Sequence, residues 1–135
     1  MDVKIMFKNV NDKTDCVTPE FVHELMQREP IHQHTTLNDK INDFTTYFES
    51  MPRYEYTVKD GNKLIAIMVI TDHYDQELGQ RILTPITAYS TRTGALFGGY
   101  RELYRIAKHH GINWLMLSKT DGYKQVWERK KISVA

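Results

Sequence analysis

The chain has 135 residues, 41% of them hydrophobic and 26% charged, which is typical of one globular domain with its own core over residues 1–135. A formal net charge of +1 excludes a strong whole-chain attraction to nucleic acid, and no apolar run is long enough to cross a membrane. The one cysteine, Cys16, excludes an internal disulfide, and the amino terminus lacks an apolar signal-peptide core, so we expect a cytoplasmic location.

The first third of the chain predicts a strand and two helices. Residues 3–10 form the apolar run of a first strand. Thr18 and Pro19 are typical of a helix start, because threonine caps the first turn and proline fits the first helical position. Thr36 begins a second helix, whose apolar positions recur every three or four residues: Leu37, Ile41, Phe44, Phe48 and Met51.

The middle third predicts strands. Residues 54–74 contain two strand-like runs around Asp60-Gly61, a strong hairpin signal. The run at 64–70 is apolar on both faces, which indicates a strand at the centre of a sheet. Residues 82–89 predict the next strand, in which Pro85 must lie at a bulge or where no ladder hydrogen bond is needed.

The last third predicts a helix, a strand, a short helix and a short strand. Leu96, Tyr100, Leu103 and Ala107 share one helix face, and Gly111 ends that helix. Residues 112–118 read as a strand, 121–131 as a short helix and 132–135 as a last strand. From residue 101 onward the chain carries eight Lys/Arg and three Asp/Glu, so its end is cationic.

The predicted order is β-α-α-β-β-β-α-β-α-β, an α+β fold with a mixed, mostly antiparallel sheet and helices on both faces. This order resembles the GCN5-related N-acetyltransferase (GNAT) family across nearly the whole chain, most closely the small GNAT-like proteins of bacteriophages. In that family a turn of the type Q/R-x-x-G-x-G/A follows the fourth strand and holds the pyrophosphate of coenzyme A. The counterpart here has Gly94 at the first glycine position, while Thr91 replaces Gln/Arg and Leu96 replaces the second small residue.

The resemblance implies acetyl-CoA, or another acyl-CoA, as cofactor. It places the pyrophosphate at Thr91, Arg92, Thr93, Gly94, Ala95 and Leu96, and the pantetheine amides along Ile86, Thr87 and Ala88. The physics of the turn agrees, because free N–H groups at a helix start, hydroxyls and an arginine all stabilise an anion, and the turn holds no acid. In the alternative interpretation Ser90 or Thr93 caps the helix and Arg92 points to solvent.

Tyr123 and Asp72 are the candidates for acid–base chemistry. The family often has a tyrosine in its fourth helix that protonates the departing thiolate. When the two sequences are aligned on the last strand, Trp127 takes the position of that tyrosine, and its indole N–H does not serve as an acid. Tyr123 lies one helical turn earlier. The alternative is that Tyr123 and Trp127 only pack their helix on the sheet. Asp72 and His73 follow the central strand. They either supply a catalytic base or belong to a solvated loop.

We therefore expect an acyl-CoA-dependent N-acyltransferase that acetylates a small-molecule or protein amine. The alternative is a non-catalytic GNAT-like phage protein, either a virion component or a module that binds a host protein. A homodimer is compatible with both, membrane binding is not expected, and DNA binding through the basic end ranks last. We expect no metal site, because nothing completes a ligand set around His32 and His34.

Overall fold

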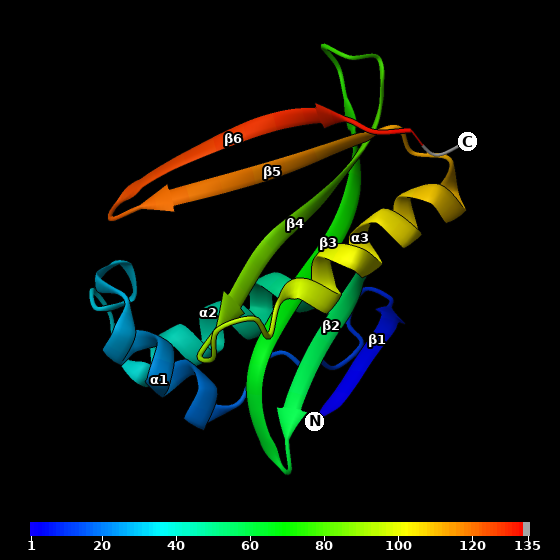
Figure 1. Ribbon diagram of the computed structural model, residues 1–135. Coiled ribbons are helices and arrows are strands. Elements are labelled where there is room, and N and C mark those ends of the chain that lie inside the picture. Colours follow the sequence, from blue (N-terminus) through cyan, green and yellow to red (C-terminus); the bar gives the residue numbers. More distant parts are fainter. Residues whose placement is uncertain (134–135) are drawn as a thin grey trace.

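The computed structural model describes residues 1–133 and has one six-stranded mixed sheet with helices on both faces (Figure 1). The strands are β1 (Asp2–Lys8), β2 (Arg53–Asp60), β3 (Lys63–Asp75), β4 (Gln80–Ser90), β5 (Trp114–Asp121) and β6 (Lys124–Lys131). The helices are α1 (Pro19–Arg28), α2 (Leu37–Glu49) and α3 (Phe97–His110), with a 3₁₀ turn η1 (Pro30–His32) between the first two. The predicted α+β class is confirmed.

The strands lie in the sheet in sequence order, and every neighbouring pair is antiparallel except β4 and β5. These two run parallel and share a single paired position, Leu83 opposite Leu115. Beyond that position β5 and β6 leave the rest of the sheet as a two-stranded ribbon that points over α1 (Figure 1). The sheet is therefore split into a four-stranded part and a hairpin.

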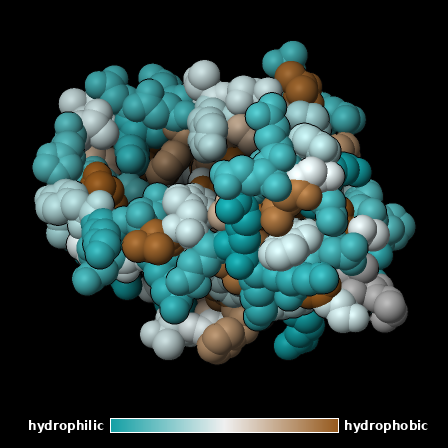
Figure 2. All heavy atoms as spheres, turned by 90° about the horizontal axis from the view of Figure 1, so that it is seen from above, coloured by the Kyte–Doolittle hydropathy of each residue, from teal (hydrophilic) through white to brown (hydrophobic). Residues whose placement is uncertain are grey.

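Two apolar clusters fill the two faces of the sheet. On one face, side chains of α1 and α2 such as Phe21 and Phe48 pack on Ile67 and Val69 of β3. On the other face, α3 packs on Tyr56, Met68 and their neighbours. The β3 run at 64–70 is buried on both faces, as its uniformly apolar sequence predicts. In the view of Figure 2 apolar side chains are scattered among hydrophilic ones.

The predicted helix and turn signals are confirmed in the structure. Thr18 and Thr36 each accept a hydrogen bond from the backbone N–H three residues later, as N-cap residues do. Gly111 ends α3 with a φ of 66°, a conformation that glycine adopts without strain. Pro85 lies at a β-bulge: Val69 faces Thr87 and Ile70 faces Pro85, so Ile86 is the extra residue on β4.

The predicted helix at 121–131 is wrong. Gly122, with a φ of 60°, closes a tight hairpin between β5 and β6, and residues 124–131 form a strand exposed along its whole length. Asp121-Gly122 is itself a hairpin signal, and it outweighs the helical spacing of Tyr123 and Trp127. The predicted last strand fails in part: Ile132 and Ser133 belong to no strand, and 134–135 lie outside the described residues. Within 1–133, no helix has the length and apolar character to cross a membrane.

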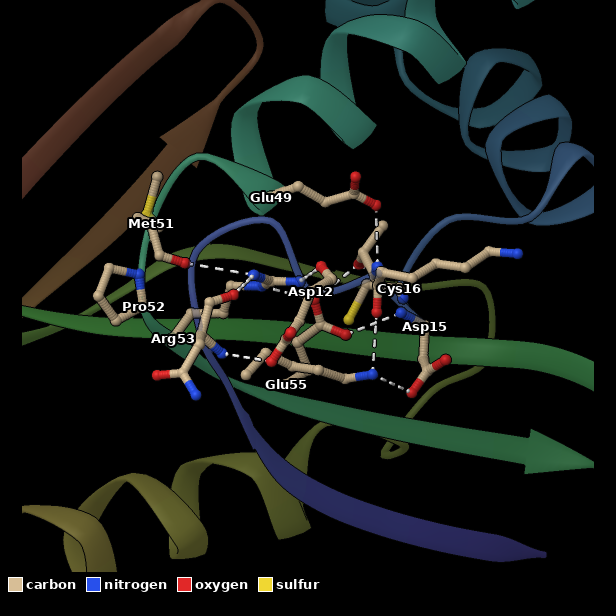
Figure 3. A network of polar contacts seen from close by, with 12 residues as sticks. Asp12, Asp15, Cys16, Glu49, Met51, Pro52, Arg53 and Glu55 are labelled. Carbon is tan, nitrogen blue, oxygen red and sulfur yellow. Dashed lines mark hydrogen bonds and ion pairs between the residues drawn. The ribbon is translucent and has the colours of Figure 1, made fainter.

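A buried ion pair on β2 fixes the connection between β1 and α1 (Figure 3). The side chains of Arg53 and Glu55 are 0% and 1% exposed, and Arg53 Nε lies 2.9 Å from Glu55 Oε2. Glu55 also accepts from the hydroxyl of Thr14 and the amide of Asp15. The guanidinium donates to three backbone carbonyls, those of Asn9, Met51 and Asp12. Every nitrogen and oxygen atom of the two charged groups thus has a hydrogen-bond partner, which is the condition for tolerating them in a core.

Candidate functional site

A cleft of about 260 Å³ opens where β4 and β5 diverge. The two strands separate after Leu83 and Leu115, so the β5-facing edge of β4 has no partner strand from Pro85 onward within residues 1–133. The bulge at Ile86 lies in this unpaired stretch. The walls come from five parts of the chain: Pro85 to Tyr89 of β4, Leu117, Ser118 and Thr120 of β5, Gly122, Tyr123 and Gln125 of the β5–β6 hairpin, Tyr100 of α3, and Glu29 and Ile31 at η1.

Three predicted cofactor-binding residues, Ile86, Thr87 and Ala88, line this cleft. Because their strand edge is unpaired, its backbone N–H and C=O groups can hydrogen-bond an extended ligand as a neighbouring strand would. An amide-containing chain such as pantetheine has the required donors and acceptors. The predicted strand and the bulge at Pro85, one of the two alternatives for that residue, thus lie at the opening between β4 and β5.

The turn between β4 and α3 continues from the cleft. Gly94 has a φ of +83°, and the turn is closed by hydrogen bonds from Ala95 N to Arg92 O and from Phe97 N to Gly94 O. Four further amides have no acceptor within the described part of the chain, those of Thr93, Gly94, Leu96 and Gly98. No side chain caps α3, because its N-cap residue is Leu96, so the capping interpretation of Ser90 and Thr93 is wrong. The start of α3 keeps free donors.

Two arginines flank a shallow hollow over this turn. Arg92 and Arg28, the last residue of α1, line it together with Ser90, Thr91, Thr93, Gly94 and Leu96. Thr91 is buried and donates to the carbonyl of Ile65, so it anchors the turn and has no free hydroxyl proton for a ligand. Arg28 forms no ion pair in the region that the structure describes. The hollow thus combines free amides with positive charge.

An acid lies beside the turn although the turn itself contains none. Arg92 Nη1 is 2.8 Å from Asp60 Oδ2, at the end of β2. The hydrogen bond and charge of Arg92 lower the pKa of Asp60. Both side chains are about half exposed, at 48% and 52%, so an incoming anion can compete for Arg92. Because 32 residues separate Asp60 from Arg92, the sequence alone does not reveal this ion pair.

The structure separates the two predicted catalytic residues. Tyr123 lines the cleft from the tip of the β5–β6 hairpin, is 65% exposed, and has its hydroxyl 3.3 Å from His34 Nε2. Asp72 does not line the cleft; it lies on β3, forms an ion pair with Arg81, and lines a different pocket near His110. Trp127 lies on β6 opposite Ser118, not on a helix.

A pair that sequence reading missed borders the cleft. Glu29 caps the end of α1 and lines the cleft, and His32 follows one 3₁₀ turn later. His32 Nε2 lies 3.2 Å from Glu29 Oε2, outside hydrogen-bond alignment, and the ring is 2% exposed with its edge on Tyr89. Burial lowers the pKa of His32, with a smaller effect of Lys40, whereas burial and the Glu29 charge raise the pKa of Tyr89 to about 12.

Neither a reactive cysteine nor a metal cluster is found among residues 1–133. The thiol of Cys16 is buried, and burial together with the Glu55 carboxylate raises its pKa well above the ordinary value, so it is a poor nucleophile. His32 is buried and His34 exposed. Among residues 1–133 no three His, Cys, Asp or Glu side chains gather as metal ligands.

Comparison with known proteins adds no assignment: neither the family models nor the curated proteins compared with this chain match it.

Proposed function

We propose that this protein is an acyl-CoA-dependent N-acyltransferase of the GNAT type, which transfers the acetyl group of acetyl-CoA to an amine. The observation that carries the proposal is a path made of two neighbouring hollows that share Tyr100. One is the cleft along the unpaired edge of β4, and the other is the hollow over the turn, where the amides of Thr93, Gly94 and Leu96 are free. Coenzyme A is an elongated molecule with an adenosine 3′-phosphate at one end, then a diphosphate, an arm with two amides, and a thiol at the other end. The path offers matching groups in the same order.

The two hollows of this path differ in charge. The hollow over the turn has Arg28 and Arg92, and free N–H groups at the start of a 14-residue helix add positive potential there. The cleft along residues 85–89 is bordered by tyrosines and by Glu29. The hollow over the turn stabilises a diphosphate, and the cleft stabilises an amine. This division favours a donor that lies along β4 and an acceptor that enters beside Glu29.

The chemistry is direct transfer. The neutral amine nitrogen attacks the thioester carbonyl carbon, the C–N bond forms, the C–S bond breaks, and coenzyme A leaves as a thiolate that takes up a proton. The amine gives up one proton in the same sequence. In this proposal Tyr123, a phenol on the cleft wall, supplies the thiolate proton. Asp72 lies outside the cleft and has no role in this proposal.

A second candidate is a non-catalytic module with the same fold, a phage virion component or a partner of a host protein. Three observations favour it: Arg92 already has a carboxylate partner, the fourth helix of the family is replaced by a hairpin, and β6 is exposed throughout with Val126 and Trp127 on its surface. This candidate predicts that acetyl-CoA does not bind.

Calorimetric titration with acetyl-CoA separates the two candidates, with a variant that fills the cleft. Ser118→Trp puts an indole into the cleft from β5, whereas Lys119→Trp puts it on the opposite face of the same strand. We expect saturable binding to the wild type and to Lys119→Trp, and loss of binding in Ser118→Trp. At a hundredfold excess over the dissociation constant the ligand adds about 2.7 kcal/mol of stability, which a melting curve detects. If the wild type does not bind acetyl-CoA at millimolar concentration, the acyltransferase proposal is wrong.

A further inference from the structure

We propose that the part of the cleft beside Glu29 is a binding site for an organic cation, and that the acceptor of the acyl group enters it as an ammonium ion held by the Glu29 carboxylate. The inference rests on the proposed function for the acyl-transfer step. The binding of the cation itself does not depend on that step, so it can be tested alone.

The charge of the lining supports a cationic ligand. Among the described residues that line the cleft, Glu29 is the one that carries a charge at neutral pH. Three tyrosines share the lining with it, Tyr89, Tyr100 and Tyr123. A carboxylate attracts a cation more strongly in a partly desolvated cleft than in bulk water, and aromatic faces add cation–π attraction. A neutral or anionic ligand would leave this carboxylate without a partner.

Glu29 is held in place without being neutralised. Pro30 begins a 3₁₀ turn, in which side chains three residues apart lie above one another, so His32 comes to lie against the Glu29 carboxylate. His32 is locked between Tyr89 and Phe44, at ring distances of 4.8 and 6.2 Å. Burial lowers the pKa of His32 and keeps the imidazole uncharged at neutral pH. Glu29 therefore has a fixed neighbour that leaves its charge available.

The carboxylate is also accessible. The Glu29 side chain is 43% exposed, and within residues 1–133 no lysine or arginine forms an ion pair with it. The carboxylates of Asp60, Asp75 and Glu55, in contrast, each have an arginine partner. An ammonium ion that binds here loses its proton before it attacks the thioester, and Glu29 is the carboxylate on the cleft wall that can receive it.

Nitrogen-15 NMR titration with benzylamine tests the site in the absence of any coenzyme. Benzyl alcohol, which has the same shape without the charge, is the ligand control, and the variants are Glu29→Gln and the matched Glu20→Gln. Glu20 lies on α1, the helix that Glu29 follows, is 65% exposed and does not line the cleft. We expect benzylamine to shift signals of residues 86–89 and 117–120 with saturation, at least tenfold weaker binding to Glu29→Gln, and unchanged binding to Glu20→Gln.

Two outcomes overturn the inference. Equal binding of benzylamine and benzyl alcohol to the wild type would show that charge is not recognised, and this comparison needs no variant. Equal binding of benzylamine to Glu29→Gln and the wild type would show that the carboxylate is not the receptor. A parallel titration of the same samples with acetyl-CoA separates the two proposals: if acetyl-CoA fails to bind while benzylamine depends on Glu29, the cation site stands and the acyltransferase proposal falls.

Discussion

Removing one partner of the buried Arg53–Glu55 pair should cost much of the stability of the fold. Arg53→Met keeps the length of the apolar stem but leaves the Glu55 carboxylate, 1% exposed, without its cation. It also leaves three backbone carbonyls without their guanidinium donors. Loss of one member of a buried pair costs roughly 3–5 kcal/mol, because the remaining charge stays desolvated.

The expected change in melting temperature follows from the size of the chain. Unfolding entropy is about 2.1 cal/mol/K per residue, which gives about 0.28 kcal/mol/K for 135 residues. A loss of roughly 3–5 kcal/mol then lowers the melting temperature by about 11–18 °C. Circular dichroism melts and urea titrations measure both quantities.

Arg81→Met is the matched control, because Arg81 is 57% exposed and its ion pair with Asp72 lies at the surface. An exposed pair contributes less than about 1 kcal/mol. The double variant Arg53→Met/Glu55→Gln should be more stable than Arg53→Met alone, because glutamine keeps a hydrogen-bonding side chain and removes the isolated charge. The reasoning is refuted if Arg53→Met melts within a few degrees of Arg81→Met, or if the second substitution restores nothing.

Three further predictions concern packing, pH and reactivity. Gly98→Ala places a Cβ 2.5 Å from the hydroxyl of Tyr56, so it should cost about 1–3 kcal/mol in urea unfolding, and adding Tyr56→Phe should restore part of the loss. Burial lowers the pKa of His32 in the fold, so the unfolded state binds more protons below about pH 6.5; the free energy of unfolding should fall as pH decreases from 7.5 to 5.5, with a smaller fall in His32→Phe. Cys16 should react with a thiol reagent only as fast as the chain opens, because its thiol is buried and burial raises its pKa; rapid labelling of the native protein would contradict this.

Local patterns predict most of the elements because their signals lie within a few residues. The caps at Thr18 and Thr36, the stop at Gly111 and the bulge at Pro85 all depend on backbone requirements of single turns or strands. The wrong prediction of a helix at 121–131 also came from a local pattern. Tyr123 and Trp127 fit a helix by spacing, but a glycine with positive φ at 122 and pairing with β5 decide in favour of a strand.

The site is harder to predict from the sequence because its contacts join segments that are far apart in the chain. Asp60 reaches Arg92 across 32 residues, so the charge of the turn cannot be judged from the turn alone. Glu29 meets Tyr89 only because α1 packs on the face of the sheet where β4 ends. The spacing of Glu29 and His32 fits this arrangement, because side chains three residues apart lie above one another once the 3₁₀ turn has formed.

The single parallel pair between β4 and β5 has a mechanical consequence. From Leu115 to Asp121 the strand extends by about 20 Å, at roughly 3.3 Å per residue. With Leu115 as the pivot, a tilt of about 10° displaces the far end by about 3.5 Å, because a long arm multiplies a small rotation. The apolar side chains around Leu115 then set the width of the cleft from the pivot end, so substitutions there should change that width without touching a ligand in the cleft.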